Sequence, residues 1–245
     1  MHRVLIAPTA VHDGSITITD LATLHHLLDV LRVQVGEPLE CFDGQGNMYA
    51  GTILRRSRST LIVTVDRQTE EPSPGVSITL AQALVKPERF DWGIQKATEL
   101  GVARIVPLVT ARTTIRPASV EGARHARWQR IVESAATQCG RASVPRIELP
   151  QRFDQFVQTL TPSSAMVFMP TLATATVPLR EALRGVGGAR ELIALIGPEG
   201  DFTPEEALLA QRHGAQLVSL GRLTLRSETA AIAAIVMLQH AVGLL

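Results

Sequence analysis

The stretch LIALIGPEGDFTPEEALLAQRHGAQLVSL, residues 192–220, decides the fold because it holds a strand, a loop, a helix and a second strand in direct succession. Residues 192–196 are wholly apolar, as in strands that are buried on both faces of a sheet. In the loop that follows, Gly197 and Gly200 enclose a Pro-Glu pair. Neither glycine has a side chain to block a ligand, and Gly200 can adopt backbone angles closed to other residues.

The helix of this stretch carries clear end signals. Thr203 is a suitable N-cap, Pro204 suits the first helical position, and Glu206 completes a capping box. Gly214 ends the helix, and residues 216–220 form the next predicted strand. Open α/β sheets bind ligands beyond the carboxyl ends of their strands, so the loops after both strands are candidate ligand loops.

The second loop, GRLTLRSETA at residues 221–230, leads into the last helix. Ser227 is predicted to cap that helix, and Glu228 in its first turn is favoured by the helix dipole. The helix is rich in Ala and Ile, which predicts close packing on most sides. Either loop alone is better interpreted as an ordinary well-capped turn. Two in tandem, with an arginine and a glutamate beside the second, favour a ligand site.

Outside this stretch, the predicted secondary structure differs between the residues before 70 and those after 75. Short strand-like runs at 16–19, 39–42, 49–54 and 60–65, with one helix near 21–31, predict a small β-barrel. Residues 70–75 then resemble a linker. Beyond it, strands predicted at 77–84, 103–109, 144–149 and 165–169 alternate with helices at 87–100, 119–139, 154–160 and 178–183. This alternation predicts an α/β domain with a mostly parallel sheet.

Composition narrows the class of protein. Hydrophobic residues make up 45% of the 245 residues and charged residues 19%, as in an ordinary globular protein. No secretory signal is recognisable, and the most apolar stretch, 229–245, falls short of a membrane span. Cys41 and Cys139 are expected to be free thiols in the cytoplasm. No P-loop, dinucleotide fingerprint or metal-ligand spacing occurs, so no metal is expected.

The basic residues are unevenly distributed. The formal net charge is only +1, but residues 86–148 hold eleven Lys and Arg against six Asp and Glu. A second cluster is formed by Arg55, Arg56 and Arg58. Such local basic surface can attract a phosphate backbone, although a solvated face in an arginine-rich chain explains the charge equally well.

Several separated motifs together resemble the RsmE-type family of 16S ribosomal RNA uridine-N3 methyltransferases, in the SPOUT superfamily. They are LIGPEGDF at 195–202 and SLG-x-x-x-LRSETAA at 219–231, preceded by QKATELG at 95–101 and ESAATQ at 133–138. Arg141 with Val144 and Pro145 follows the last of these. VLR at 30–32, with His26 and Gly36, is similar to the N-terminal barrel of that family. The resemblance covers nearly the whole chain.

The resemblance implies a PUA-like, RNA-binding β-barrel at 1–71 and a SPOUT methyltransferase domain at 76–245 with a deep C-terminal trefoil knot. It implies a homodimer packed through the knot, a cytoplasmic location, and 16S ribosomal RNA or the small ribosomal subunit as partner. The cofactor would be S-adenosyl-L-methionine. Its contacts would come from Leu195, Ile196, Gly197, Pro198, Glu199, Gly200, Leu220, Gly221, Leu223, Leu225, Arg226 and Thr229.

Methylation of a uracil nitrogen requires that its weakly acidic proton be removed or the resulting anion stabilised. Arg226 is the candidate for stabilising negative charge on a uracil carbonyl or for holding a phosphate. Glu228 or Glu199 would orient the base or accept the proton, and the sequence does not distinguish them. We expect the RNA backbone to be bound by basic residues. The candidates for this RNA track are Arg32, Arg55, Arg56, Arg58, Lys86, Lys96, Arg112 and Arg141.

Two positions depart from the family pattern. Asp201 stands where a second glycine is usual, and Leu223-Thr224 replaces a common Arg-Ile pair. Asp201 puts a negative charge near the cofactor loop, and the second change removes one possible positive contact. Three other functions stay open: a ribose 2′-O-methyltransferase, a non-catalytic RNA-binding protein of ribosome assembly, and a generic nucleotide-binding α/β enzyme.

Overall fold

The computed structural model describes residues 1–114, 122–160, 165–172 and 175–245. The chain divides into two compact units, the first formed by Met1–Ser73 with Ala136–Val144 and the second by Pro74–Ala135 with Pro145–Leu245. The return of residues 136–144 to the first unit was not indicated by the sequence. The predicted helix start near Ser119 and the basic residue Arg116 lie outside the described residues.

The first unit is built on a mixed six-stranded sheet of order β1-β4-β5-β6-β3-β2. β1 and β4 pair in parallel and the other neighbours are antiparallel. Among the described residues β1 and β2 stand at the two edges, so the closed barrel stays a prediction. The strands are β1 (His2–Leu5), β2 (Val11–His12), β3 (Ser15–Ile18), β4 (Pro38–Phe42), β5 (Asn47–Arg56) and β6 (Leu61–Glu70).

A helical segment closes the core of this unit. After the short 3-10 helix η1 (Pro8–Ala10), the chain forms α1 (Leu21–His25), which continues as one π-helical turn, η2 (His26–Val30). α1 begins where it does because the Asp20 carboxylate accepts a hydrogen bond from the Thr23 N–H at 2.8 Å. Leu24 and Leu27 are buried among the apolar side chains of the strands.

The returning segment Ala136–Val144 is bound into the first unit by polar and apolar contacts. The carboxylate of Glu71 accepts hydrogen bonds from the backbone N–H groups of Ala142 (3.1 Å) and Ser143 (2.8 Å). Ala136 and Ala142 pack with Phe42 in a small buried cluster. These contacts explain why the last turn of a long helix belongs to this unit.

The second unit contains an eight-stranded sheet of order β10-β8-β7-β13-β11-β14-β12, with β9 paired to β8. Every pairing is parallel, which confirms the α/β class expected from the alternating pattern. The strands are β7 (Ser77–Ala83), β8 (Arg104–Val109), β9 (Arg146–Ile147), β10 (Gln151–Arg152), β11 (Ala165–Pro170), β12 (Val177–Pro178), β13 (Glu191–Ile196) and β14 (Ala215–Ser219).

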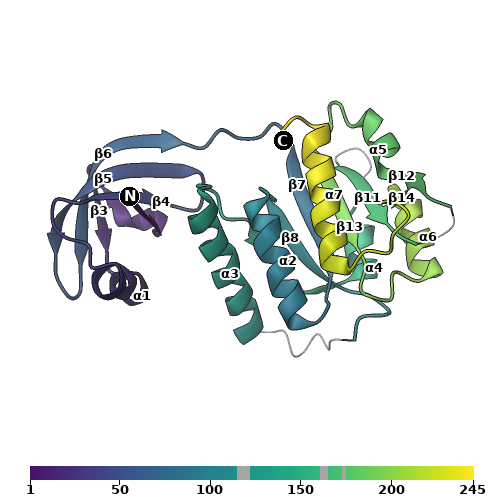
Figure 1. Ribbon diagram of the computed structural model, residues 1–245, viewed down its shortest axis with the longest axis horizontal. Helices are drawn as coiled ribbons and strands as arrows, with labels where there is room; N and C mark the ends of the chain where they lie inside the picture. The colour runs from purple at the N-terminus through teal and green to yellow at the C-terminus, as the bar shows by residue number, and fades with distance from the viewer. Residues whose placement is uncertain (115–121, 161–164, 173–174) are drawn as a thin grey trace. The chain divides into compact units, whose positions relative to one another are not determined.

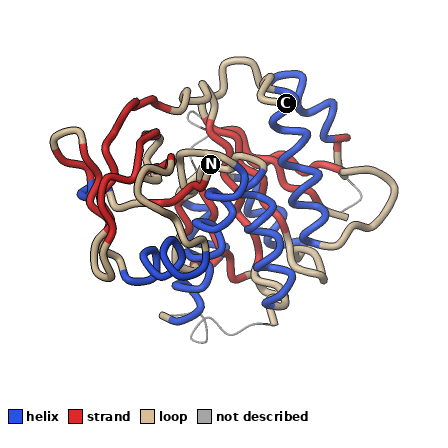
Figure 2. Tube along the Cα trace, turned by 60° about the vertical axis from the view of Figure 1, so that its left-hand side comes forward, coloured by secondary structure: helices blue, strands red, loops and turns tan. Residues whose placement is uncertain are grey.

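Helices cover this sheet on both faces (Figures 1 and 2). α7 packs against β7 and β13, and α2 lies beside it, while α4 and α6 share a buried core with the other face. β13 is central, which explains why residues 192–196 are all apolar. The helices are α2 (Pro87–Glu99), α3 (Ala123–Cys139), α4 (Phe153–Gln158), α5 (Leu179–Ala182) with η4 (Leu183–Gly185), α6 (Pro204–Arg212) and α7 (Ser227–Ala241).

The end signals of α6 are confirmed. The Thr203 side chain accepts from the Glu206 N–H, and the Glu206 carboxylate accepts from the Thr203 N–H, with Pro204 in the first turn. Within the described residues, none of the helices has the length and hydropathy that crossing a membrane requires.

Candidate functional site

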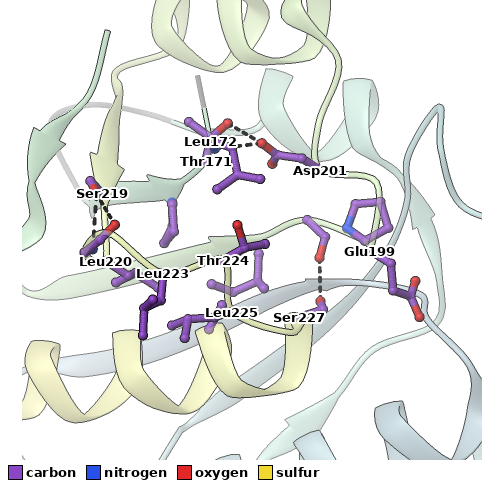
Figure 3. A pocket seen from close by; sticks show the side chains of 16 residues that line it. Thr171, Leu172, Glu199, Asp201, Ser219, Leu220, Leu223, Thr224, Leu225 and Ser227 are labelled. Carbon is purple, nitrogen blue, oxygen red and sulfur yellow. Dashed lines mark hydrogen bonds between the residues drawn. The ribbon is translucent and has the colours of Figure 1, made fainter. Parts of the chain in front are cut away.

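A pocket opens at the carboxyl ends of β11, β13 and β14, three strands that are neighbours in the parallel sheet. Three loops form its walls, and the start of α7 closes it (Figure 3). The lining residues are 170–172 after β11, 196–199 and 201 after β13, 219–221 and 223–225 after β14, and Ser227 and Ala230 of α7. The site therefore lies where parallel α/β sheets bind ligands.

Eight of the twelve residues predicted to contact a cofactor line this pocket: Ile196, Gly197, Pro198, Glu199, Leu220, Gly221, Leu223 and Leu225. Four do not line it. Leu195 is fully buried in the core, and Gly200 lies against the side chain of Arg112. Arg226 and Thr229 are exposed outside the lining.

Sequence reasoning missed the wall that residues 170–172 provide. This segment carries no motif, and its place in the pocket depends on β11 lying between β13 and β14 in the sheet. The other lining residues that were not predicted flank or interrupt the two known loops: Asp201, Ser219, Thr224, Ser227 and Ala230.

The loop after β13 is tightly packed. Phe202 is 4% exposed and its ring lies 5.3 Å from that of Phe153. A Cβ atom on Gly197 would come within 3.0 Å of the Phe202 ring, so only glycine fits there without displacement. The guanidinium of Arg112 donates to the carbonyl oxygens of Gly200 and Phe202. The loop is therefore held by contacts of its own.

The left-handed residue of this loop is Asp201, with φ of 60°, and Gly200 does not adopt a positive φ. Asp and Asn tolerate this conformation better than other side chains. The Asp201 carboxylate accepts from the hydroxyl of Thr171 and the N–H of Leu172, both at 2.8 Å (Figure 3). The expected negative charge at position 201 is therefore engaged by hydrogen-bond donors.

Ser227 has a different role from the one predicted. Arg226, not Ser227, occupies the N-cap position of α7, and no side chain caps this helix. The buried hydroxyl of Ser227 instead donates to the carbonyl of Gly197 and accepts from the side-chain amide of Gln82 at 2.6 Å. A serine at the start of a helix can either cap the helix or bond a neighbouring group. Because the loop after β13 lies close by, the Ser227 hydroxyl bonds that loop and does not cap α7. Ser227 thereby joins the two predicted ligand loops.

The candidate catalytic residues are only partly brought together. Glu199 lines the pocket, and its carboxylate lies 3.1 Å from the guanidinium of Arg89. Glu228 does not line the pocket; it lies beside α2, 3.9 Å from the same guanidinium, and one carboxylate oxygen is buried without a hydrogen-bond partner. Arg89 on α2, which sequence reasoning missed, thus links the two carboxylates. Arg226 is exposed at the entrance to α7.

Several candidate RNA-binding residues are engaged within their own unit. Arg56 donates to the carbonyl of Val33 at 2.6 Å, and Lys96 forms an ion pair with Glu99 at 2.7 Å. Burial lowers the pKa of Arg141, although the carboxylate of Glu71 opposes that shift.

The remaining candidate RNA-binding residues are exposed to solvent, and one of them also bonds the loop after β13. Arg32, Arg55, Arg58 and Lys86 are exposed, and Arg32 has a left-handed φ of 56°. Arg112 is exposed but holds the loop after β13. The free basic surface is therefore smaller than the charge count suggested.

The pocket fits an adenosine-type group. Leu220, Leu223 and Leu225 provide apolar surface for a flat ring system. Gly221 has open space where a side chain would stand, so a ligand can approach the backbone. Among the described residues, no group of three His, Cys, Asp or Glu side chains is placed to hold a metal ion.

Comparison with known families gives two matches. Residues 71–239 match a family described as the RNA methyltransferase domain, and residues 18–66 match the RNA methyltransferase PUA domain. The chain is 34% identical over 231 residues to "Ribosomal RNA small subunit methyltransferase E" of Synechocystis sp., covering 94% of this chain and 74% of that protein.

Solved structures agree with this likeness. A putative methyltransferase of Legionella pneumophila in complex with the bound cofactor SAM shares 32% identity and a TM-score of 0.86, covering 98% of this chain and 97% of that one. "Ribosomal RNA small subunit methyltransferase E" of Neisseria gonorrhoeae bound to S-adenosyl methionine shares 29% identity and a TM-score of 0.83, with the same coverage.

Proposed function

Because the chain belongs to the RNA methyltransferase family, we propose that it methylates small-subunit (16S) ribosomal RNA with S-adenosyl-L-methionine, at N3 of a uridine. The observation that carries this proposal is the pocket formed by the loops after β11, β13 and β14. It contains eight of the twelve residues that the sequence motifs selected, in a chain whose relatives are named as methyltransferases of this RNA.

The cofactor would be held mainly by the lining residues. Leu220, Leu223 and Leu225 would contact the adenine ring, while backbone groups near Gly197 and Gly221 would bind its polar edges. The sulfonium group supplies an electrophilic methyl group, so the transfer itself needs no metal. Pocket residues then have to position the acceptor base and exclude water from it.

Proton removal from uracil N3 is assigned to a carboxylate of the site. Glu199 is the better placed of the two candidates, because it lines the pocket whereas Glu228 does not. Arg89, at 3.1 Å, would hold the Glu199 carboxylate in position. Arg226, exposed before α7, would bind a uracil carbonyl or a phosphate of the incoming RNA. Glu228, beside α2, would act only through Arg89.

The RNA track is proposed from the exposed basic residues. Arg32, Arg55 and Arg58 in the first unit, and Lys86 in the second, are placed to contact phosphates from the surface. Phosphate contacts release counterions, so RNA affinity is expected to fall steeply as salt is added. An affinity that does not change with salt would contradict this assignment.

The knot and the homodimer belong to the same proposal. The threading of the loops is supported by the order β13-β11-β14 and by the packing of α7 back onto β7 and β13. The homodimer is supported by α7, which is apolar on most sides and leaves Val236 37% exposed. Light scattering on a Val236→Glu variant tests the homodimer, which the charge should dissociate. A cytoplasmic location follows from the proposed ribosomal substrate.

The decisive experiment uses labelled S-adenosylmethionine and small ribosomal subunits that lack their modifications. The RNA is digested after incubation and the labelled nucleoside is identified. Labelled 3-methyluridine is the expected product. A label on ribose would show that the enzyme methylates a ribose 2′-oxygen instead of the base. Cofactor binding without any labelled RNA would favour a non-catalytic RNA-binding protein. An Arg226→Ala variant that folds and keeps full activity would remove Arg226 from the scheme.

A further inference from the structure

Asp201 occupies a backbone conformation that favours glycine. Its φ of 60° is left-handed, and of the residues that the structure describes only Asp13 and Arg32 share this feature without being glycine. A side chain at such a position strains the backbone. The strain is tolerated where the side chain makes contacts that glycine lacks, and the carboxylate of Asp201 makes three.

Two of the three hydrogen bonds join two loops of the pocket, and the third lies within the loop after β13. One carboxylate oxygen accepts from the Thr171 hydroxyl and the Leu172 N–H, both at 2.8 Å, and the other accepts from the Phe202 N–H at 2.8 Å. Thr171 and Leu172 follow β11, whereas Asp201 follows β13. All three residues line the pocket, so the carboxylate lies where these two walls meet (Figure 3).

The same link reaches the third loop. The backbone N–H of Thr171 donates to the carbonyl of Val218 at 3.1 Å, at the end of β14 and just before the loop that begins at Ser219. Thr171 is therefore bonded on one side to Asp201 and on the other to the strand that leads into the third wall. Hydrogen bonds therefore connect Asp201, through Thr171, to the end of β14.

We propose that Asp201 is a positioning residue for the cofactor, whose carboxylate fixes the loop after β11 against the loop after β13 before the cofactor binds. This inference rests on the proposed function, because it takes the pocket as the S-adenosylmethionine site. Without the carboxylate, residues 171–172 must be ordered when the ligand binds, which lowers affinity. Asp201 makes no contact with reacting atoms in this scheme.

The test measures binding of S-adenosylhomocysteine and S-adenosylmethionine by calorimetry to the full chain and to Asp201→Gly, Thr171→Val and the double variant. Asp201→Gly is expected to weaken binding about tenfold, because hydrogen bonds to a charged group are lost. Thr171→Val should weaken it less. In the double variant the threonine change should add nothing further, since both substitutions break the same link.

The matched control is Asp13→Gly, which removes a left-handed aspartate from an exposed turn of the first unit. It should leave cofactor affinity unchanged. Thermal unfolding of Asp201→Gly should stay close to that of the unchanged protein, because glycine relieves the backbone strain. A purely structural role would instead lower the unfolding temperature and leave the affinity of the folded protein unchanged.

The outcomes separate the two proposals. If the unchanged protein binds neither compound, the proposed function fails and takes this inference with it. If it binds and Asp201→Gly binds equally well, only the role of Asp201 is overturned. Effects of Asp201→Gly and Thr171→Val that multiply would also overturn it, because the two residues would then act separately.

Discussion

The loops after β13 and β14 line one pocket, but they are held in different ways. In the first, Gly197 packs against the buried ring of Phe202, and Asp201 and Arg112 hold the backbone with hydrogen bonds. In the second, Leu223 is 80% exposed, and the side-chain hydrogen bonds among the described residues 219–224 are those between Ser219 and Gly221. The first loop is therefore packed into the fold, whereas the second leaves the apolar side chain of Leu223 uncovered.

This difference predicts that substitutions that disturb the packing around Gly197 in the first loop change the stability of the fold, whereas substitutions in the second loop change binding. Ser227 is the strongest test, because its buried hydroxyl bonds both Gly197 and Gln82. Ser227→Ala removes the hydroxyl partner of both groups and should lower the free energy of unfolding by about 3 kcal/mol. Unfolding in urea measures this change in free energy.

Ser219→Ala is the matched control from the second loop. It removes contacts between the Ser219 hydroxyl and the backbone of Gly221 at 3.2 and 3.1 Å, at a solvent-accessible site. Because water replaces these bonds, the change in unfolding free energy should stay within about 0.5 kcal/mol. If the two serine variants lost the same unfolding free energy, the two loops would not differ in how they are held.

Gly197→Ala tests the packing of the first loop. The added Cβ would stand 3.0 Å from the Phe202 ring and 3.4 Å from the Asp201 carboxylate, so neighbours must move. Overpacking of this kind should destabilise the fold by about 2 kcal/mol, as thermal unfolding will show. Gly185→Ala, where nothing lies within 4 Å, should be nearly neutral. A neutral Gly197→Ala would mean that the loop yields easily.

Thr203→Ala tests the helix start that anchors the first loop. It removes the acceptor for the Glu206 N–H at 3.2 Å and so breaks the capping box. The expected loss is about 1 kcal/mol of unfolding free energy. Thr203→Ser keeps the acceptor and should recover most of it; if both variants unfold alike, the hydroxyl is not the cause.

Leu223→Ala tests whether the second loop contributes to ligand binding and not to the stability of the fold. Because this side chain is 80% exposed, the unfolding free energy should change by less than about 0.5 kcal/mol. Affinity for S-adenosylhomocysteine, measured by calorimetry, should fall severalfold because apolar surface that the ligand covers is lost. A clear loss of stability without a change in affinity would place this loop in the same class as the first.

Local signals predicted what depends on a few neighbouring residues. The α/β class followed from the alternation of strands and helices, and the capping box of α6 followed from Thr203 and Glu206. Most of the two ligand loops followed from the motifs at 195–202 and 219–231. Local signals gave the wrong answer for Ser227, because a distant contact with Gly197 decided its role.

The sequence by itself determined the fold class, the family and two of the three walls of the pocket, because strand burial, helix caps and loop glycines act over a few residues. Only the tertiary structure decided that residues 170–172 form the third wall, that Arg89 links Glu199 to Glu228, and that Asp201 joins two loops. These contacts join residues at least 29 positions apart. They arise from the order of strands in the sheet, which no local pattern encodes.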